Sequence, residues 1–415
     1  MSSLDTSSRR RLEHTRRGRF LASPHAHVLR RLLSRLHVGR LVVELPSGEI
    51  CDARGPVAGP EASLRIVHHR ALRRLFSRGD VGFAEGFIEG DWTTPDLLEL
   101  MRLAAANSPH MGADVSGSPI FRLFNRLQLR FRANSRRGSR GNIMSHYDLG
   151  NEFFQLWLDP TLLYSSALWH EDTADLETAQ QNKLARIVER LEIHGGESVL
   201  EIGCGWGALA RRLVEAGARR VTGLTLSPAQ LAHARESLAG FDGGEKIELR
   251  LQDYRDVASP FDRVVSIEMI EAVGEAYWPA YFGKIAQVLK PGGRALIQAI
   301  TIADARFADY RARPDFIQRH IFPGGFLPCP SAMAEQAARA GLRLAGVENF
   351  GLSYAKTLAE WRRRFEARRE EVAAQGFDER FQRLWTYYLC YCEAGFREKA
   401  TDVGFYLLEK TGERA

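Results

Sequence analysis

Cysteine is scarce in this 415-residue chain, and its five cysteines include no CxxC pair. So low and odd a number excludes a disulfide framework, and the spacing offers no metal site, so we expect a reducing compartment. No apolar run approaches the roughly 18–20 residues that cross a bilayer. The polar N-terminus continues into three arginines at residues 9–11 with no apolar segment behind them, which argues against a signal peptide. The sequence therefore predicts a cytoplasmic protein, and at roughly 100–200 residues per domain two compact units are the simplest organisation.

Lysine is absent from residues 1–140, but arginine is abundant there. This segment holds 24 arginines and 13 acidic residues, a balance of +11, whereas the remainder holds 33 basic and 38 acidic residues, a balance of −5. A positive module joined to a mildly acidic one indicates that the first holds an anionic partner while the second does the chemistry. Nucleic acid and anionic lipid are both candidates. The alternative is an arginine-rich composition spread over a solvated surface.

Stretches rich in glycine, proline and serine divide the chain. We expect a basic disordered tail at residues 1–20, where arginine and serine dominate, and an N-terminal domain at residues 21–106. Residues 107–140 should form a linker and a helix, and residues 141–415 a larger catalytic domain. Within the N-terminal domain the pattern predicts two strands and one helix, at residues 41–45, 64–67 and 96–105.

The segment after the linker has the pattern of an amphipathic helix at residues 121–132. Leu123, Leu127 and Phe131 recur every four residues, and arginines recur with the same spacing on a neighbouring stripe. Residues 121–140 contain seven arginines and no acidic residue. Such a cationic face suits anionic lipid headgroups, so we expect the N-terminal part to associate with a phospholipid membrane. The alternative is a helix that packs across the domain junction.

Strand and helix patterns alternate between residues 190 and 300, which is typical of a doubly wound parallel sheet. The fold class is therefore α/β, with the N-terminal domain as a smaller mixed α+β unit. The predicted strands lie at residues 198–202, 220–224, 247–251, 261–267 and 295–298, and the helices at 208–216, 228–238 and 277–289. Residues 291–293 (PGG) should form a turn before the last of these strands.

A glycine cluster follows the first of these strands and indicates a cofactor site. Gly203 and Gly205 belong to a GxGxG spacing, tighter than the GxGxxG of dinucleotide folds, and Glu201 precedes them. The second strand ends in Thr225 without the carboxylate that a dinucleotide ribose needs, and Asp253 follows the third. This set fits S-adenosylmethionine, whose amino and carboxylate groups would meet the glycine loop, its ribose the second strand and its adenine Asp253. The sequence therefore predicts a Rossmann-like class I methyltransferase fold.

Several motifs outside the glycine loop make the sequence similar to a known family. It resembles the cyclopropane-fatty-acyl-phospholipid synthases, which include the mycolic acid cyclopropane synthases, densely over residues 140–405. The motifs are 146–151 (HYDLGN), 163–167 (LYSSA), 177–183 (ETAQQNK), 199–207 (VLEIGCGWG), 224–230 (LTLSPAQ), 252–256 (QDYRD), 321–325 (IFPGG) and 354–358 (YAKTL). Residues 79–80 and 86–92 resemble the N-terminal domain of the longer bacterial enzymes more thinly.

The resemblance implies an activity and a set of cofactor residues. A methyl group passes from S-adenosylmethionine to the cis double bond of an unsaturated phospholipid acyl chain, and loss of a proton then closes a cyclopropane. The resemblance also implies a homodimer, and we expect the protein to be peripheral on the inner face of the membrane. The cofactor residues that it implies are Tyr164, Ser165, Gly203, Gly205, Thr225, Gln230, Asp253 and Tyr254.

Cys392 occupies the position of a cysteine that the family marks as its active-site residue. The alternative is a core cysteine, since Cys392 lies between Tyr388 and Phe396 in an apolar helical pattern. The proposed chemistry contains no step that needs a thiol nucleophile.

The sequence departs from the family at the positions that hold a bicarbonate ion, the base that removes the proton. Those positions are Ser166, Glu271, Gln298, Ile300 and His320 in this chain. Glutamate and isoleucine match, but the family has cysteine, histidine and tyrosine at the other three. His320 is ionisable near neutrality and is a candidate base, with a structural histidine as the alternative.

These substitutions leave methyl transfer intact as a prediction and leave the product open between a cyclopropane and a methyl- or methylene-branched chain. Two other classes of function stay open. A methyltransferase acting on a soluble small molecule would have no use for a cationic helix. A nucleic-acid binder is poorly supported, because the basic segment carries its few aromatic residues on or near the apolar stripe, so we expect no nucleic-acid partner.

Overall fold

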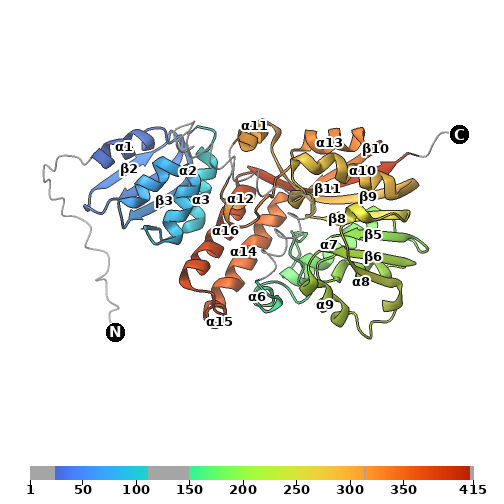
Figure 1. Ribbon diagram of the computed structural model, residues 1–415. Coiled ribbons are helices and arrows are strands. Elements are labelled where there is room, and N and C mark those ends of the chain that lie inside the picture. The colour runs from blue at the N-terminus through green and yellow to red at the C-terminus, as the bar shows by residue number, and fades with distance from the viewer. Residues whose placement is uncertain (1–23, 111–148, 313–314, 412–415) are drawn as a thin grey trace, which may run out of the picture.

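The computed structural model describes residues 24–110, 149–312 and 315–411. A smaller N-terminal unit lies at one end of the molecule and a large α/β unit at the other, with a group of helices between them (Figure 1). The predicted basic tail at 1–20 and the predicted cationic helix at 121–132 lie outside the described residues, so both stay predictions. Among the described residues, no helix has the length and apolar character that crossing a membrane requires.

The N-terminal unit is a four-stranded mixed sheet with helices. Its elements are α1 (Pro24–Leu33), β1 (Val38–Glu44), β2 (Ile50–Arg54), β3 (Val57–Ile66), α2 (Arg70–Ile88), β4 (Trp92–Thr93) and α3 (Leu97–Asn107). The strand order is β2-β1-β3-β4, with β1 antiparallel to β2 and parallel to β3. The side chain of Asp96 caps α3 by accepting the Glu99 N–H at 3.0 Å. The structure thus confirms the predicted helix and both predicted strands, and it adds α1, β2, α2 and β4.

The large unit contains the remaining elements. Its helices are α6 (Asn151–Gln155), α7 (Leu176–Leu191), α8 (Ala208–Glu215), α9 (Pro228–Ser237), α10 (Trp278–Val288), α11 (Asp304–Ala312), α12 (Phe316–His320), α13 (Pro330–Arg339), α14 (Gly351–Ala367), α15 (Arg369–Ala374) and α16 (Glu379–Arg397). Its strands are β5 (Ser198–Ile202), β6 (Arg220–Thr225), β7 (Ile247–Leu251), β8 (Phe261–Ile267), β9 (Leu289–Ile302), β10 (Leu342–Asn349) and β11 (Thr401–Lys410). Short 3-10 turns are η2 (Gly244–Lys246), η3 (Tyr254–Asp256), η4 (Ile270–Ala272) and η5 (Glu275–Tyr277).

These strands form one seven-stranded sheet in the order β10-β11-β9-β8-β5-β6-β7. The chain moves outward from β5 to β6 and β7 on one side and to β8 and β9 on the other, so β5 and β8 flank a topological switch point. The doubly wound α/β fold is therefore confirmed. The prediction of an all-parallel sheet was wrong for the last strand of the chain, because β11 runs antiparallel to both β9 and β10.

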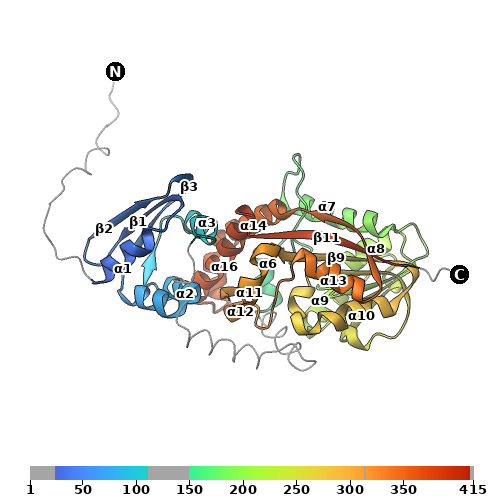
Figure 2. The same ribbon diagram turned by 90° about the horizontal axis from the view of Figure 1, so that it is seen from above.

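Helices cover both faces of the sheet because the strands alternate their buried side chains between them. Val199 packs with α7 and α8 on one face, and Leu200 packs with α10 and α13 on the other. Figure 2 shows these pairs of helices on opposite sides of the strands. Ligands of such sheets bind at the carboxyl ends of the strands, beside the switch point.

The predicted turn at residues 291–293 lies inside β9. The pairing of β8 with β9 shifts register between Phe261 and Arg263, so the extra residues bulge out of the strand without ending it. Gly292 takes φ 74 there, a left-handed conformation that glycine adopts without strain. The turn residues were thus identified correctly, but they form an irregularity within one long strand.

Helix α16 joins the two units. It packs against α14 of the large unit and against α2 and α3 of the N-terminal unit. The Arg102 Nε of α3 donates to Glu398 at 2.7 Å just after α16 ends, and the rings of Phe87 and Tyr387 lie 5.8 Å apart. The buried core that contains Trp92 of the N-terminal unit continues through this helix into the large unit. The boundary between the two units is therefore a packed interface.

Candidate functional site

A cavity of about 1080 Å³ extends through both units. We distinguish three parts of it. The glycine end contains Glu201, Gly203, Gly205, Thr225 and Gln230 at the carboxyl ends of β5 and β6. The carboxylate centre contains Glu268, Glu271, Tyr354, Tyr388 and Cys392. The apolar end contains Leu29, Leu33, Leu100, Met101 and Leu103 of the N-terminal unit.

The glycine end is shaped by backbone that only glycine adopts freely. Gly203 and Gly205 have φ values of 85 and 51, in the left-handed region. The N–H groups of Gly203 and Cys204 donate to the Leu224 carbonyl at 3.0 and 2.8 Å, so the loop is tied to the neighbouring strand. The loop therefore presents bare backbone to the cavity, where a ligand can approach closely.

Glu201 places a carboxylate beside this loop. The residue is 3% exposed, and its Oε2 has no hydrogen-bond partner among the described residues. Burial raises the pKa of Glu201 to about 8. A buried carboxylate oxygen without a partner is costly unless a ligand supplies a donor. The ammonium group of S-adenosylmethionine is such a donor, so this end of the cavity fits that cofactor.

Thr225 and Gln230 are held in fixed positions next to Glu201. The Thr225 hydroxyl donates to Gln230 Oε1 at 2.8 Å and accepts the Ser227 N–H at 3.1 Å. Ser227 caps α9 and Pro228 occupies its first turn, as the sequence predicted. Both side chains line the cavity, where a hydroxyl and an amide suit the ribose hydroxyls of the cofactor.

Asp253 and Tyr254 differ in where they point. Tyr254 lines the cavity, as does its neighbour Gln252. Asp253 is not among the lining residues, and its two carboxylate oxygens accept from Arg255 at 2.9 and 2.6 Å. The expected contact of Asp253 with the adenine therefore stays a prediction, while Tyr254 is placed to meet a ligand.

Tyr164 and Ser165 line the cavity from the loop before α7. The Tyr164 hydroxyl lies 2.9 Å from that of Tyr388. Ser165 Oγ accepts from the fully buried Lys183 Nζ at 2.6 Å. Burial lowers the pKa of Lys183 to about 8, and Glu268 is the foremost group that opposes the shift. The ammonium group therefore remains largely charged at neutral pH and close to a carboxylate.

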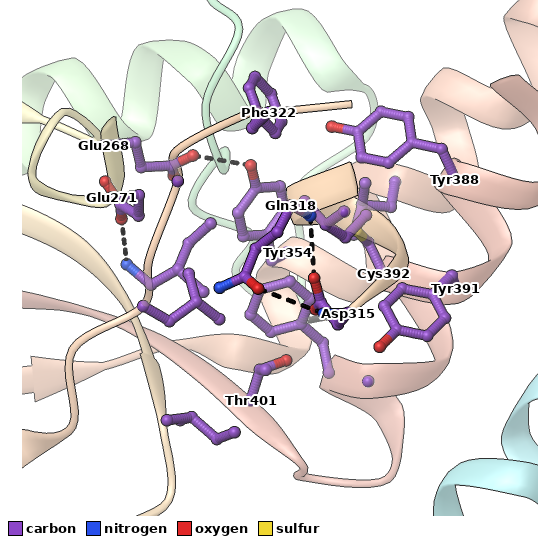
Figure 3. Close-up of a pocket in the computed structure, with 18 of the residues that line it drawn as sticks. Glu268, Glu271, Asp315, Gln318, Phe322, Tyr354, Tyr388, Tyr391, Cys392 and Thr401 are labelled. Carbon is purple, nitrogen blue, oxygen red and sulfur yellow. Dashed lines mark hydrogen bonds between the residues drawn. The ribbon is translucent and has the colours of Figure 1, made fainter. Parts of the chain in front are cut away.

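Glu268 dominates the carboxylate centre. Its Oε1 accepts the Ser166 N–H at 2.8 Å and Gln298 Nε2 at 2.7 Å, and its Oε2 accepts the Tyr354 hydroxyl at 2.7 Å. Burial raises the pKa of Glu268, and hydrogen bonds from Tyr354 and Ser166 oppose that shift first. Figure 3 shows this carboxylate turned towards the Tyr354 ring at one side of the cavity.

Glu271 lies one turn further along the chain in a different environment. Its Oε1 accepts the Ile300 N–H at 2.6 Å, and its Oε2 has no partner among the described residues. Burial raises the pKa of Glu271 to about 8, and the charge of Glu268 adds to the shift. Two neighbouring carboxyl groups resist double ionisation. Since the oxygens of Glu268 accept three hydrogen bonds, we assign the charge to Glu268 and the proton to Glu271 at neutral pH.

The structure places the other sequence-predicted catalytic residues around this centre or away from it. Ser166 and Gln298 do not line the cavity but hold Glu268 in place. His320 lies elsewhere, with its Nε2 3.8 Å from the Glu85 carboxylate of α2. The hydroxyl at the centre comes instead from Tyr354 on α14.

Cys392 lines the cavity from α16, half-buried. Burial raises the pKa of its thiol, so the sulfur is protonated and weakly nucleophilic. The position thus agrees with a residue that lines the site, and the chemistry of its surroundings does not favour a nucleophile.

Sequence reasoning missed Glu268, Tyr354, Lys183 and Tyr388. Tyr354 and Lys183 stand inside motifs that carry the family resemblance, and the motifs were a usable signal. Glu268 had a weaker one: it is the first residue after a predicted strand, at the edge of the sheet where ligands bind.

Comparisons with known proteins agree with this site. The family model described as "Mycolic acid cyclopropane synthetase" matches residues 134–405. The chain is 37% identical to "Tuberculostearic acid methyltransferase UfaA1" of Mycobacterium tuberculosis, over 86% of this chain and 85% of that protein. It is 36% identical to the Escherichia coli "Cyclopropane-fatty-acyl-phospholipid synthase", over 81% of this chain and 85% of that one.

A solved structure supports the same assignment. The mycolic acid cyclopropane synthase CmaA1 complexed with SAH and CTAB has a TM-score of 0.62 and 32% identity, over 65% of this chain and 98% of that one. With the glycine end, the sheet order and the family model in agreement, the chain belongs to the mycolic acid cyclopropane synthetase family of S-adenosylmethionine-dependent methyltransferases.

Proposed function

We propose that this enzyme transfers a methyl group from S-adenosylmethionine to the cis double bond of an unsaturated phospholipid acyl chain. The observation that carries the proposal is the single cavity that joins the glycine end to the apolar end. Leucine and methionine side chains of the N-terminal unit suit a hydrocarbon tail, and the carboxylate centre lies between that tail and the cofactor. The names of two relatives, a tuberculostearic acid methyltransferase and a cyclopropane-fatty-acyl-phospholipid synthase, support the same substrate class.

The reaction makes particular demands on the residues around the cavity. When bound, the sulfonium cofactor supplies an electrophilic methyl group. An alkene is a poor nucleophile, so positioning and exclusion of water must supply much of the rate. Methyl transfer leaves a carbocation on the lipid, which aromatic faces stabilise. Tyr164, Phe322 and Tyr388 line this part of the cavity and are the aromatic groups that we assign to this role.

Ring closure and branching are two outcomes of the same transfer. A cyclopropane forms when the cation closes on the transferred carbon, and a methylene- or methyl-branched chain forms when it does not. Branching is the second candidate because Ser166 and Gln298 stand where the resemblance implies cysteine and histidine. The name of the UfaA1 relative, a methyltransferase, favours it as well.

Expression in a host that lacks its own enzyme tests the proposal. Cells would receive methyl-labelled methionine, and extracted phospholipids would be analysed by mass spectrometry, with an empty vector as control. We expect label in an unsaturated chain that has gained one carbon. A ring-containing chain as the sole product would eliminate branching, and phospholipids without label would overturn the proposed function.

The enzyme would bind its lipid substrate at a membrane surface. The +11 balance of residues 1–140 supports binding to anionic phospholipid, with the enzyme as a peripheral protein on the inner face. Vesicles with and without anionic lipid, sedimented with the protein, test this step. Undiminished methylation of a soluble substrate without vesicles would favour the small-molecule alternative. A homodimer remains a prediction that size-exclusion chromatography with light scattering would check.

A further inference from the structure

The family resemblance implies a bicarbonate ion, and the residues of this chain do not fit one. Two of the groups at that position, the Ser166 N–H and the Gln298 amide, donate to Glu268, and so does the Tyr354 hydroxyl. The Ile300 N–H donates to Glu271. The donors that would hold an anion are therefore already used by the two carboxyl groups, and the charge of Glu268 would repel a second anion.

We propose that the carboxylate of Glu268 is itself the base that takes the proton from the lipid cation. This inference rests on the proposed function and names the residue that completes the reaction. A side chain of the protein would thus perform the step for which the family resemblance implies a bound ion.

The hydrogen bonds leave one acceptor position on this carboxylate. The two oxygens of a carboxylate offer about four acceptor directions. Oε1 accepts two hydrogen bonds, from Ser166 and Gln298, whereas Oε2 accepts one, from Tyr354. The remaining direction on Oε2 is available to a proton of the substrate, since Glu268 lines the cavity.

Other ionisable groups near the cavity are less suited to accept the proton. Glu271 already carries a proton at neutral pH, and His320 lies against α2 outside the cavity lining. Cys392 is a protonated thiol. Lys183, with its ammonium group on Ser165, supplies the positive charge that balances an ionised Glu268. Within the carboxylate centre this leaves Glu268 as the ionised carboxylate; the further lining carboxyl groups Asp80, Asp309 and Asp315 come from α2, α11 and the N-cap of α12.

The proposed step conserves atoms and electrons. The π pair of the alkene forms the new C–C bond while the C–S bond of the donor breaks, which leaves S-adenosylhomocysteine and a carbocation on the lipid. Glu268 then removes a proton from the transferred methyl group. The C–H electron pair closes the ring, or after a 1,2-hydride shift becomes the double bond of a methylene branch. Glu268 ends as a carboxylic acid and releases its proton to water.

The backbone at this position suggests a sharp test. Glu268 has φ 47, a conformation that glycine adopts without strain, so E268G removes the carboxylate and leaves the backbone relaxed. The variant would also free the donors of Ser166, Gln298 and Tyr354 for an added anion. Glu192 offers a matched control, since it is another glutamate with positive φ, at 51, and it does not line the cavity.

The experiment compares wild type, E268Q, E268G and E192G in bicarbonate-depleted buffer with phospholipid vesicles. We expect E268Q and E268G to lose about 10²–10⁴-fold in turnover, the usual contribution of a general base. Affinity for S-adenosylhomocysteine, measured by calorimetry, should stay close to wild type and so report intact folding. Added bicarbonate or formate should restore turnover to E268G but not to E268Q.

A second measurement needs no turnover. Carbon-13-labelled bicarbonate, titrated into the cofactor-free proteins and followed by NMR line width, should bind E268G and not wild type or E192G. Saturable binding of bicarbonate to wild type, or full turnover by E268Q, would overturn the inference. If wild type itself never methylates lipid, the proposed function fails, and the binding of bicarbonate still decides whether Glu268 occupies the anion position.

Discussion

The glycine end and the apolar end of the cavity are built in opposite ways. The glycine end is polar and comes from one short stretch of chain, with side chains fixed by hydrogen bonds such as Thr225 to Gln230. The apolar end is assembled from α1, β1 and α3 of the N-terminal unit, where most of the lining side chains are apolar. Cofactor binding should therefore be a property of the large unit, whereas selection of the acyl chain should depend on how the two units pack.

The largest effect on cofactor affinity should come from Glu201 at the glycine end. A hydrogen bond to a charged group contributes about 1.5–3 kcal/mol, so E201Q should weaken S-adenosylmethionine binding by roughly 10- to 100-fold. Because burial raises the pKa of Glu201 to about 8, wild-type affinity should rise as pH rises towards that value, and the variant should lose this dependence. Calorimetry across that pH range measures both. Equal affinities would mean that Glu201 does not meet the cofactor.

A second variant should affect only the apolar end. Ala105 of α3 lines the cavity and its neighbour Ala106 does not. A105F would remove space for the acyl chain, and lost fit of one or two methylenes costs about 1–3 kcal/mol, or 10- to 200-fold in turnover. The measurement is methylation of vesicle lipids, with S-adenosylhomocysteine affinity as the check on the other end. A106F is the matched control. Similar losses in both variants would indicate general damage to α3.

At the carboxylate centre, where the two ends meet, the proton on Glu271 should make the free energy of unfolding depend on pH. The folded-state pKa of Glu271 is about 8, above its ordinary value of 4.5. Between these values the folded state keeps a proton that the unfolded state has lost, so the free energy of unfolding falls as pH rises.

E271Q cannot lose a proton, so its stability relative to wild type should increase from low pH to pH 8. We expect an advantage of about 1–3 kcal/mol at the upper end. Urea denaturation of both proteins at several pH values gives the difference, and a difference independent of pH would contradict the assignment of the proton to Glu271.

The smallest effect should come from the polar rim of the interface between the units. Arg102 bridges to Glu398, and both side chains are partly exposed, at 32% and 18%. Such pairs contribute about 0.2–1 kcal/mol, so R102A should lower the thermal midpoint slightly without changing cofactor affinity. R363A, which removes a pair within α14, is the control. A large loss of lipid turnover in R102A but not in R363A would contradict this small effect. It would show that the shape of the apolar end depends on this ion pair between the units.

The same contrast explains what the sequence predicted. Short segments rich in valine, leucine and isoleucine and a capped helix at Ser227 follow local rules, so β5, β7 and β8 were located to the residue. The glycine end was identified because its residues lie at the end of β5 and at the end of the neighbouring strand β6. The antiparallel β11 was not foreseen, because strand direction depends on tertiary pairing.

The carboxylate centre was only partly foreseen for a related reason. Glu268 and Tyr354 are 86 positions apart, and their hydrogen bond exists only after α14 packs beside the strand ends. His320 was expected where the structure has the hydroxyl of Tyr354, because a position in the sequence gives no direction for a side chain. The apolar end was missed since α1, β1 and α3 carry no motif, only ordinary core residues.

The left-handed backbone at Glu268 has a consequence for engineering. A side chain in that conformation costs about 1–2 kcal/mol relative to glycine. Glycine there would relieve that strain but would leave three buried donors without their acceptor, at about 1–3 kcal/mol each. Screens on this scaffold should score product together with melting temperature, because a substitution at this position changes the backbone strain and the carboxylate centre at once.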